Sequence, residues 1–216
     1  MRKIIGLSDE LMAELEDGIV LPVMEDFYTI QGEGFHTGKA AWFIRIGGCD
    51  VGCHWCDVKE SWNPNFFPPV RTQDVVGKAL ENKIQTVVVT GGEPLNYNLQ
   101  LLTNLFHNKN ISCHIETSGS SPLSGDWDWI CLSPKLNKKP LPSVYPVADE
   151  LKVIIEKEED LLWAEENAFK VNSDCYLFLQ PEWSKREIIT PLLVSYIMKN
   201  PKWQLSLQSH KYIHIP

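Results

Sequence analysis

Three cysteines lie close together in residues 47–57 and have the residue type and spacing of a metal centre. Three residues separate Cys49 from Cys53, and two separate Cys53 from Cys56. Three thiolates can hold an iron–sulfur cubane, a cluster that normally takes four cysteine ligands, and no fourth cysteine is near in the sequence. One iron would stay open to a ligand that carries an amine and a carboxylate. The spacing therefore indicates a catalytic cluster rather than one that only stores an electron.

Structural zinc is the alternative for the same segment, with His54 or a remote cysteine as the fourth ligand. Zinc sites usually combine two short ligand clusters, and the chain has no second Cys/His pair of suitable spacing. Both metals remain open from the spacing alone. The other three cysteines stand alone in apolar segments, and we expect them to be buried core thiols: Cys113, Cys131 and Cys175.

A Gly-rich stretch at residues 27–38 is the second segment that could bind a ligand. A phosphate-binding loop would need a Lys followed by Ser or Thr, and this stretch has no Lys or Arg. The side chains of Gln31 and Glu33 instead suit hydrogen bonds to a flat heterocycle rich in N–H donors, such as a purine or a pterin. A plain turn is the alternative.

These segments must be positioned by the regular elements, in which short β-branched runs alternate with longer amphipathic ones. The pattern predicts strands at 41–46, 84–90, 112–116, 129–132, 150–155, 176–180 and 203–208, and helices at 72–82, 98–106, 157–170 and 187–199. Several strands are nearly continuous in apolar residues, which is typical of parallel strands covered by helices. We therefore predict an α/β fold, a partial TIM-like barrel of mostly parallel strands.

Polar and Gly-rich residues follow four of the predicted strands. They are Gly91-Gly92-Glu93-Pro94, Thr117-Ser118-Gly119, Ser133-Pro134-Lys135 and Gln180-Pro181. Ligand sites of α/β proteins lie at the carboxyl ends of parallel strands, so we expect these segments to share one rim. A turn explains any one of them alone.

Composition limits the classes of function. The chain has 28 acidic and 20 basic residues and a formal net charge of -8, which argues against nucleic acid and anionic membranes as partners. No apolar run approaches the roughly 18 residues of a membrane span, and no signal peptide is evident, so we expect a cytoplasmic protein. We expect one domain, 1–216, in which 1–24 form an N-terminal extension of unknown role, with Ser8 as the N-cap of a short acidic helix.

The cysteine spacing, with Trp55 before the last cysteine, resembles the motif of the radical S-adenosylmethionine (SAM) superfamily. Residues 91–94 resemble the second motif of that superfamily. The resemblance implies a 4Fe-4S cluster on the three cysteines, SAM bound to the open iron, and an electron donor such as flavodoxin or ferredoxin. The residues implied to bind SAM are Trp55, Cys56, Asp57, Gly92, Glu93, Gly119, Ser133, Pro134 and Lys135. For Lys135, a solvated turn lysine is the alternative.

Further segments extend the similarity over most of the chain: residues 30–34, Arg45, the cysteine loop with Trp55-Cys56-Asp57, residues 91–94, 116–119 and 133–135, and Pro216. Together they resemble the 7-carboxy-7-deazaguanine synthase family of queuosine and deazapurine biosynthesis. The resemblance implies a carbon–nitrogen lyase that contracts the ring of 6-carboxy-5,6,7,8-tetrahydropterin, releases ammonia, forms 7-carboxy-7-deazaguanine and regenerates SAM. It also implies a homodimer. The residues implied to bind the pterin are Ile30, Gln31, Gly32, Glu33, Arg45, Thr117, His210 and Pro216.

Two of these residues allow independent arguments. A guanidinium binds a carboxylate bidentately, which suits Arg45 for the substrate carboxylate, with a surface ion pair as the alternative. Pro216 ends an apolar and aromatic tail, 209–216, that we expect to pack rather than fray.

The chain departs from the family pattern at Val58, where the family carries a Thr or Ser whose hydroxyl coordinates Mg²⁺. Valine offers no oxygen to a hard cation. Either Mg²⁺ is held by the substrate and another oxygen, such as that of Asp57, or the protein works without it.

Two other classes of function share parts of this pattern. A glycyl-radical-enzyme activase has the same cysteine spacing, but it needs an open groove for a protein substrate, whereas residues 30–34 and the apolar tail suit a closed pocket. A non-catalytic zinc or iron–sulfur interaction module would leave residues 91–94 and 133–135 unexplained.

Overall fold

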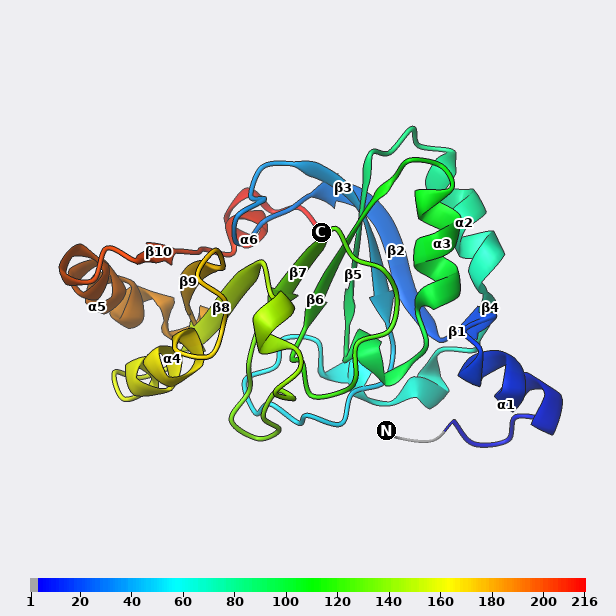
Figure 1. Cartoon of the computed structure of the whole chain (residues 1–216), viewed down its shortest axis with the longest axis horizontal. Coiled ribbons are helices and arrows are strands. Elements are labelled where there is room, and N and C mark those ends of the chain that lie inside the picture. The colour runs from blue at the N-terminus through cyan, green and yellow to red at the C-terminus, as the bar shows by residue number, and fades with distance from the viewer. Residues whose placement is uncertain (1–3) are drawn as a thin grey trace.

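The computed structural model describes residues 4–216 and is built around a curved sheet of eight strands (Figure 1). The strand order is β10-β9-β8-β7-β6-β5-β3-β2, and all neighbours are parallel except β2 and β3. The strands are β2 (Val23–Ile30), β3 (Ala40–Ile46), β5 (Thr86–Gly91), β6 (Ser112–Thr117), β7 (Trp129–Leu132), β8 (Glu150–Ile155), β9 (Tyr176–Pro181) and β10 (Trp203–Leu205). Because the edge strands β2 and β10 do not pair, the sheet is an open, partial barrel, as predicted.

Helices cover the outer, convex face of this sheet (Figure 1). They are α2 (Thr72–Leu80), α3 (Gln100–His107), α4 (Asp160–Ala168) and α5 (Arg186–Lys199), while α1 (Asp9–Glu16) and α6 (Ser209–Ile213) lie near the ends of the chain. Short 3-10 turns occur at Lys59–Trp62, Pro64–Phe66, Pro94–Asn96, Tyr145–Val147 and Trp183–Lys185. No helix of the described residues is long and apolar enough to cross a membrane.

The alternation of side chains along each strand separates the core from the cavity. In β3, Ile44 and Ile46 are fully buried in the core, whereas Phe43 and Arg45 between them point to the concave face and line a cavity. In β8, Leu151 and the other odd-numbered positions enter the core and the even-numbered ones face inward. Runs that look continuously apolar therefore still give each strand a functional inner face.

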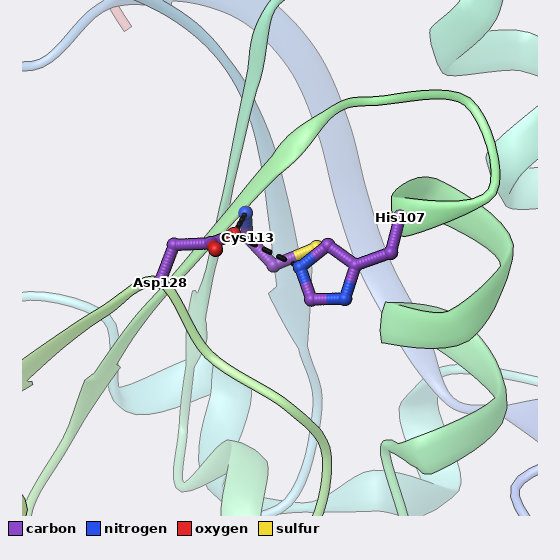
Figure 2. A group of neighbouring side chains, drawn as sticks. All are labelled: His107, Cys113 and Asp128. Atoms are coloured by element: carbon purple, nitrogen blue, oxygen red, sulfur yellow. Dashed lines mark hydrogen bonds and ion pairs between the residues drawn. The ribbon is translucent and has the colours of Figure 1, made fainter.

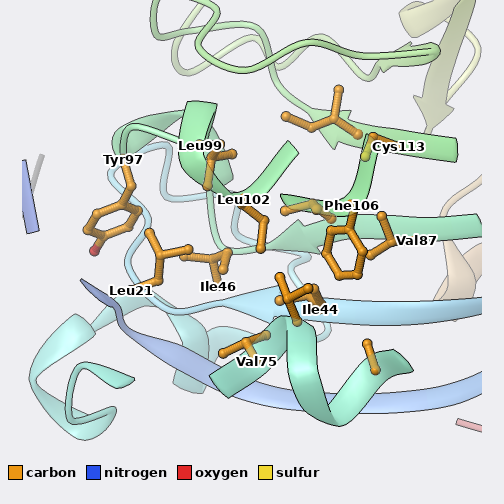
Figure 3. Packing of buried hydrophobic residues seen from close by; sticks show 14 of the residues in the cluster. Leu21, Ile44, Ile46, Val75, Val87, Tyr97, Leu99, Leu102, Phe106 and Cys113 are labelled. Carbon is orange, nitrogen blue, oxygen red and sulfur yellow. The ribbon is translucent and has the colours of Figure 1, made fainter. Parts of the chain in front are cut away.

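Two core clusters fill the space between the sheet and the helices. The larger one joins β3, β5 and β6 to α2 and α3, and Figure 3 shows Phe106 and Leu102 of α3 against Ile44 and Val87 of the sheet. The second cluster lies under α4 and α5 and contains Trp203, which is 1% exposed. The three isolated cysteines are free thiols and buried, which confirms that prediction: Cys113, Cys131 and Cys175.

The N-terminal segment contributes to the larger cluster through Leu15 and Leu21. Ser8 is the N-cap of α1, as predicted, and its Oγ accepts a hydrogen bond from the Leu11 N–H at 3.3 Å. The short strands β1 (Val20–Leu21) and β4 (Val70–Arg71) pair antiparallel and fix this segment beside α2. Residues 1–3 of the predicted extension 1–24 lie outside the described residues.

A His–Cys–Asp group ties α3 to β6 (Figure 2). The Asp128 carboxylate accepts hydrogen bonds from the Cys113 N–H at 2.7 Å and from His107 Nε2 at 2.9 Å. These bonds hold the C-terminal end of helix α3 against the first residues of strand β6. The group lies on the outer side of the sheet and does not line the cavity.

The structure differs from the predicted elements at several places, including the short strands β1 and β4, which were not predicted. The strand β2 was not predicted, because it is a half-exposed edge strand in which Glu25, Asp26 and Thr29 interrupt the apolar pattern. The tail folds into the short helix α6. The last strand ends at Leu205 rather than at residue 208.

Candidate active site

A cavity of about 270 Å³ opens at the carboxyl ends of the parallel strands. The segments after β3, β5, β6 and β7 meet there with Gln180 near the end of β9, as the predicted rim requires. Of the residues predicted to bind the cluster, SAM or pterin, those that line the cavity are Ile30, Gln31, Gly32, Glu33, Arg45, Cys49, Cys53, Trp55, Cys56, Asp57, Gly92, Thr117, Ser133, Lys135, His210 and Pro216. Glu93, Gly119 and Pro134 do not line it.

The cysteine loop begins directly after β3 and is held by backbone hydrogen bonds. Cys49 N–H donates to the Trp62 carbonyl at 3.2 Å, and Cys56 N–H donates to the Cys53 carbonyl at 3.1 Å. The turn after β5 packs against the same loop, since Glu93 N–H donates to the Gly48 carbonyl at 2.9 Å. A Cβ on Gly92 would lie 2.5 Å from that carbonyl oxygen, so a glycine is needed for this close approach.

The three thiols suit an iron–sulfur cluster. All three line the cavity and none forms a disulfide. Burial raises the pKa of Cys49 and of Cys53, and the positive charge of Lys135 partly lowers that of Cys53. A positively charged partner therefore stabilises the thiolate form of these cysteines. Bound there, a 4Fe-4S cluster would supply an iron to hold SAM and the electron to cleave it.

The alternative with zinc and His54 has less support from the geometry. His54 Nε2 lies 2.9 Å from Glu156 Oε2, and the imidazole is 71% exposed. Among the described residues, the ligand atoms that lie within 4.8 Å of one another as a set of three belong to His107, Cys113 and Asp128 rather than to the loop cysteines. Ligands of a single zinc ion would have to lie that close together.

Glu93 has a different environment from the one expected. The resemblance implied that Glu93 binds SAM, but its side chain is 1% exposed and points into the protein. It accepts hydrogen bonds from Thr117 Oγ1 at 2.5 Å, from the Ser118 N–H at 2.9 Å, from Ser118 Oγ and from the Leu95 N–H at 3.1 Å. These bonds use the capacity of both oxygens, so the carboxylate braces β5 against β6.

Lys135 lies between the cysteine loop and the turn after β7. Its Nζ donates to the Ser133 carbonyl and to Ser133 Oγ, both at 2.6 Å, and lies 5.6 Å from the centre of the Trp55 ring. Burial lowers the pKa of this ammonium. The side chain is therefore a sheltered cation at the cavity rather than a solvated turn lysine.

A buried charge network forms the floor of the cavity. Lys152 of β8 is 3% exposed, and its Nζ lies 2.5 Å from Glu33 Oε2 and 3.2 Å from Glu116 Oε2. Gln31 Nε2 donates to the other oxygen of Glu116 at 2.8 Å, and Gln208 Nε2 donates to the other oxygen of Glu33 at 2.8 Å. The amide and carboxylates of the Gly-rich segment are thus fixed before any ligand binds.

The pKa values in this network follow from burial and from the lysine. Burial alone would raise the pKa of Glu33, but the attraction of Lys152 and hydrogen bonds from Lys152, Gln208 and Gln180 lower it to about 2. Burial alone would lower the pKa of Lys152, but Glu116 and Glu33 raise it well above its ordinary value. Both groups are charged at neutral pH.

Helix α6 covers part of the cavity. Ser209 N–H and Oγ donate to the Gly32 carbonyl, each at 2.9 Å, and Lys211 Nζ lies 2.5 Å from Asp57 Oδ2. His210 lines the cavity, and burial lowers its pKa. The tail is held by these polar contacts, while Tyr212 remains 49% exposed, so it packs less fully than predicted.

Arg45 lies between the two environments that were considered for it, the substrate cavity and a surface ion pair. Its side chain lines the cavity, and its Nε lies 2.7 Å from Glu25 Oε1 on β2. Val58 also lines the cavity, next to Asp57. Asp57, the carboxylate adjacent to Val58 in the sequence, also lines the cavity and contacts the Lys211 ammonium.

Several cavity residues were not predicted from the sequence. They are Phe43, Thr90, Glu116, Lys152 and Gln208. The signal that could have found Lys152 is its position, because a lysine inside the apolar run of a buried strand needs carboxylate partners.

The fold and the cysteine loop define a radical SAM enzyme. A family model described as the radical SAM superfamily matches residues 43–139, which include the cysteine loop and residues 91–94.

Within that class, the chain belongs to the 7-carboxy-7-deazaguanine synthase family. It is 57% identical over 210 residues to the 7-carboxy-7-deazaguanine synthase of Flavobacterium psychrophilum, covering 97% of this chain and 100% of the relative. It is 46% identical over 194 residues to the enzyme of the same name from Synechocystis sp., covering 90% and 93% of the two chains. A solved structure titled as QueE from Escherichia coli superposes with a TM-score of 0.80 at 30% identity, covering 95% of this chain and 100% of that one.

Proposed function

We propose that this protein is a carbon–nitrogen lyase that converts 6-carboxy-5,6,7,8-tetrahydropterin to 7-carboxy-7-deazaguanine and ammonia in queuosine or deazapurine biosynthesis. Its relatives of that name cover nearly the whole chain. The observation that carries the proposal is that the cysteine loop and the Gly-rich segment 30–33 line one cavity. A substrate held by that segment lies beside the place where SAM would be cleaved.

The residues of the cavity wall account for recognition of such a substrate. Glu33 and Glu116 offer fixed acceptors to the N–H groups of a pterin, and the Lys152 ammonium contacts both carboxylates. Arg45 is a cation for the carboxylate of the substrate. Thr117, His210 and Pro216 complete the wall from β6 and the tail.

The SAM side of the cavity is assigned to the cysteine loop and the neighbouring turns. Gly92 brings backbone against the loop, and Trp55, Asp57, Ser133 and Lys135 line the wall beside the cysteines. Lys135 offers a partly buried cation at the cavity wall, which suits the SAM carboxylate. Glu93 and Gly119 act from behind this wall: Glu93 braces β6, and the Gly119 N–H donates to Thr117 Oγ1 at 2.9 Å.

The proposal extends to the surroundings of the enzyme. Its electron donor is a flavodoxin or a ferredoxin, it works in the cytoplasm as a homodimer, and residues 1–216 act as one domain. Divalent metal is not required, because Val58 supplies no oxygen and the Asp57 carboxylate is neutralised by Lys211.

An anaerobic assay tests the function. The reconstituted protein, SAM, a strong reductant and 6-carboxytetrahydropterin should yield 7-carboxy-7-deazaguanine by mass spectrometry, with SAM unconsumed. Formation of 5′-deoxyadenosine without any deazaguanine would leave the radical SAM class intact and refute the substrate. A colourless protein with stoichiometric zinc instead of about four irons per chain would refute the cluster itself.

A further inference from the structure

The inner face of the sheet is hollow beyond the floor of the substrate cavity. A second cavity of about 230 Å³, which we call the rear cavity, is lined by Ala41, Thr86 and Ser112 at the amino ends of β3, β5 and β6. A small void of about 10 Å³, the connecting void, is bordered by Trp129 and Glu150. The substrate cavity opens at the carboxyl ends of the same strands, so the two cavities lie at opposite ends of the barrel.

The connecting void shares its walls with both cavities. Gln31 lines all three spaces. Glu33 and Glu116 border both the substrate cavity and the connecting void. The other residues that border both the connecting void and the rear cavity are His36, Val88 and His114. The three spaces therefore form one line along the inner face of the sheet, with Gln31 beside each of them.

Strand β6 carries polar side chains along this line. Ser112, His114 and Glu116 occupy alternate positions and share the inner face, while Cys113 and Ile115 between them are buried in the core. Ser112 lines the rear cavity, and its Oγ lies 3.2 Å from His114 Nε2. Glu116 lies at the other end, on the floor of the substrate cavity. A row of polar groups thus leads from the rear cavity to the substrate.

The connecting void selects molecules by size. A volume of about 10 Å³ is the space of a single water-sized molecule. A pterin, a deazaguanine or SAM is far too large to enter it. Among the substrates and products of the proposed reaction, ammonia is the molecule with the size of water.

The walls of this line accept hydrogen bonds. Both ring nitrogens of His36 are buried without a partner among the described residues, and the centres of the His36 and His114 rings are 4.5 Å apart. Burial lowers the pKa of both imidazoles to about 4, so each has an unprotonated nitrogen at neutral pH. The carboxylate of Glu150, which is 3% exposed, is a further acceptor at the connecting void. A small molecule with N–H groups would satisfy these acceptors.

We propose that ammonia leaves the substrate cavity through the connecting void and the rear cavity while 7-carboxy-7-deazaguanine still occupies the site. The inference rests on the proposed function, in which one pterin gives one deazaguanine and one ammonia with no other atom gained or lost. The carbon–nitrogen bond to the leaving nitrogen breaks, and this nitrogen departs with three hydrogens as neutral ammonia.

The surroundings of the substrate cavity favour this direction. Helix α6 covers part of the cavity through its bonds to Gly32, and the organic product and SAM would occupy the rest of the front side. The floor is therefore the side that remains for a small product. Lys39 also lines the rear cavity and is exposed, so its charge favours passage of neutral ammonia, which takes up a proton in the solvent.

A single-turnover experiment tests the path, with the cluster-loaded chain in excess over nitrogen-labelled pterin, SAM and reductant. Acid quench measures deazaguanine formed on the protein, and rapid ultrafiltration measures free ammonia and free deazaguanine, all by mass spectrometry. The wild type should release ammonia before deazaguanine. Val88→Ile adds a methylene group at the connecting void, where Val88 is 2% exposed. It should delay free ammonia at least about tenfold, until deazaguanine also leaves, and keep the quenched rate within about threefold of wild type.

A second variant and a control complete the test. Thr86→Trp narrows the rear cavity at a residue that borders neither the connecting void nor the substrate cavity, and it should cause the same delay. Val194→Ile makes the same substitution as Val88→Ile at a position of α5 that is 42% exposed, and it should release ammonia like the wild type.

The outcomes separate the exit path from the proposed function. Simultaneous release of both products by the wild type, or undelayed ammonia in either Val88→Ile or Thr86→Trp, would overturn the exit path and leave the function intact. A quenched rate that falls as much as ammonia release would also overturn it, because the substitution would then act on the chemical step. A wild type that forms no deazaguanine would refute the proposed function, and the exit path with it.

Discussion

Lys152 of β8 lies 2.5 Å from Glu33, a residue 119 positions earlier in the chain, and both side chains are almost completely enclosed. This contact joins the Gly-rich segment after β2 to the far half of the sheet. The same ammonium also contacts Glu116, so one lysine holds two acceptor carboxylates at the cavity. Lys152 thus fixes the two carboxylates that would accept hydrogen bonds from a donor-rich ligand.

Replacing Lys152 by Met should destabilise the protein by about 3–5 kcal/mol, because two carboxylates would stay buried without their cation. Lys202→Met is the control, since Lys202 pairs with Glu165 and their side chains are 51% and 34% exposed; its loss should cost less than about 1 kcal/mol. Anaerobic urea unfolding, followed by circular dichroism, measures both. Equal effects would show that the buried network contributes no more than a surface pair.

Glu33 should make stability depend on pH in the acid range. Its pKa is about 2 in the folded protein and 4.5 ordinarily, so the unfolded chain takes up a proton first as the pH falls. The stabilisation from this residue is therefore complete above pH 4.5 and is lost progressively between pH 4.5 and 2. Glu33→Gln should flatten this part of the stability curve. A curve for the variant parallel to that of the wild type would contradict the assignment.

Arg45 and Glu25 provide a comparison between substrate binding and a surface ion pair. If Arg45 binds the substrate carboxylate, Arg45→Gln should raise the KM for the pterin about 10- to 100-fold, the value of one charged hydrogen bond. Glu25→Gln breaks the same ion pair from the other side and should leave KM within about threefold. Similar changes in both variants would assign Arg45 to the ion pair alone.

Val58 should make the reaction independent of divalent metal. We expect product formation by the wild type to continue at full rate in the presence of a chelator that spares the cluster. Val58→Thr adds a hydroxyl ligand at the cavity wall and should gain stimulation by Mg²⁺, while Val58→Ala should not. Loss of wild-type product on chelation, restored by Mg²⁺, would point to another oxygen ligand.

Gly34 should be intolerant of any side chain. It has a φ of +64°, and a Cβ there would lie 2.0 Å from Glu150 Oε1. Gly38 has a φ of +89° with nothing within 4 Å, so Gly38→Ala carries the backbone strain of about 1–2 kcal/mol without a clash. Gly34→Ala should lose clearly more stability than Gly38→Ala and bind the pterin more weakly. Equal losses of stability and unchanged pterin binding would show that Glu150 moves aside without cost.

Local chemistry explains which parts of the site could be predicted from the sequence. The cysteine loop and residues 91–94 are short segments with recognisable local motifs, and both contribute to the cavity wall, the second through Gly91 and Gly92. Lys152 was missed because its importance depends on which face of β8 it occupies and on carboxylates from β6 and from the segment after β2. The direction of Glu93 likewise depends on donors from β6, which no local pattern reveals.

The same reasoning applies to the fold. Parallel strands were predicted well because they are long apolar runs bounded by Gly and Pro, and their inner and outer faces follow from alternation. The edge strand β2 has only one neighbour, β3, and its burial is incomplete, so its sequence does not carry the apolar signal of a central strand. Its pairing to β3 is a tertiary effect.

Helix α6 is fastened over the cavity by charge and hydrogen bonds rather than by apolar burial. Lys211–Asp57 is half exposed on the Asp57 side, and the outward Tyr212 and Ile213 contribute little burial. An element with so few buried contacts opens at a small cost in free energy, well below that of global unfolding. Dissolved ions weaken partly exposed pairs, with a screening length of about 8 Å at physiological ionic strength. Higher ionic strength should therefore raise the rates at which ligands enter and leave the cavity.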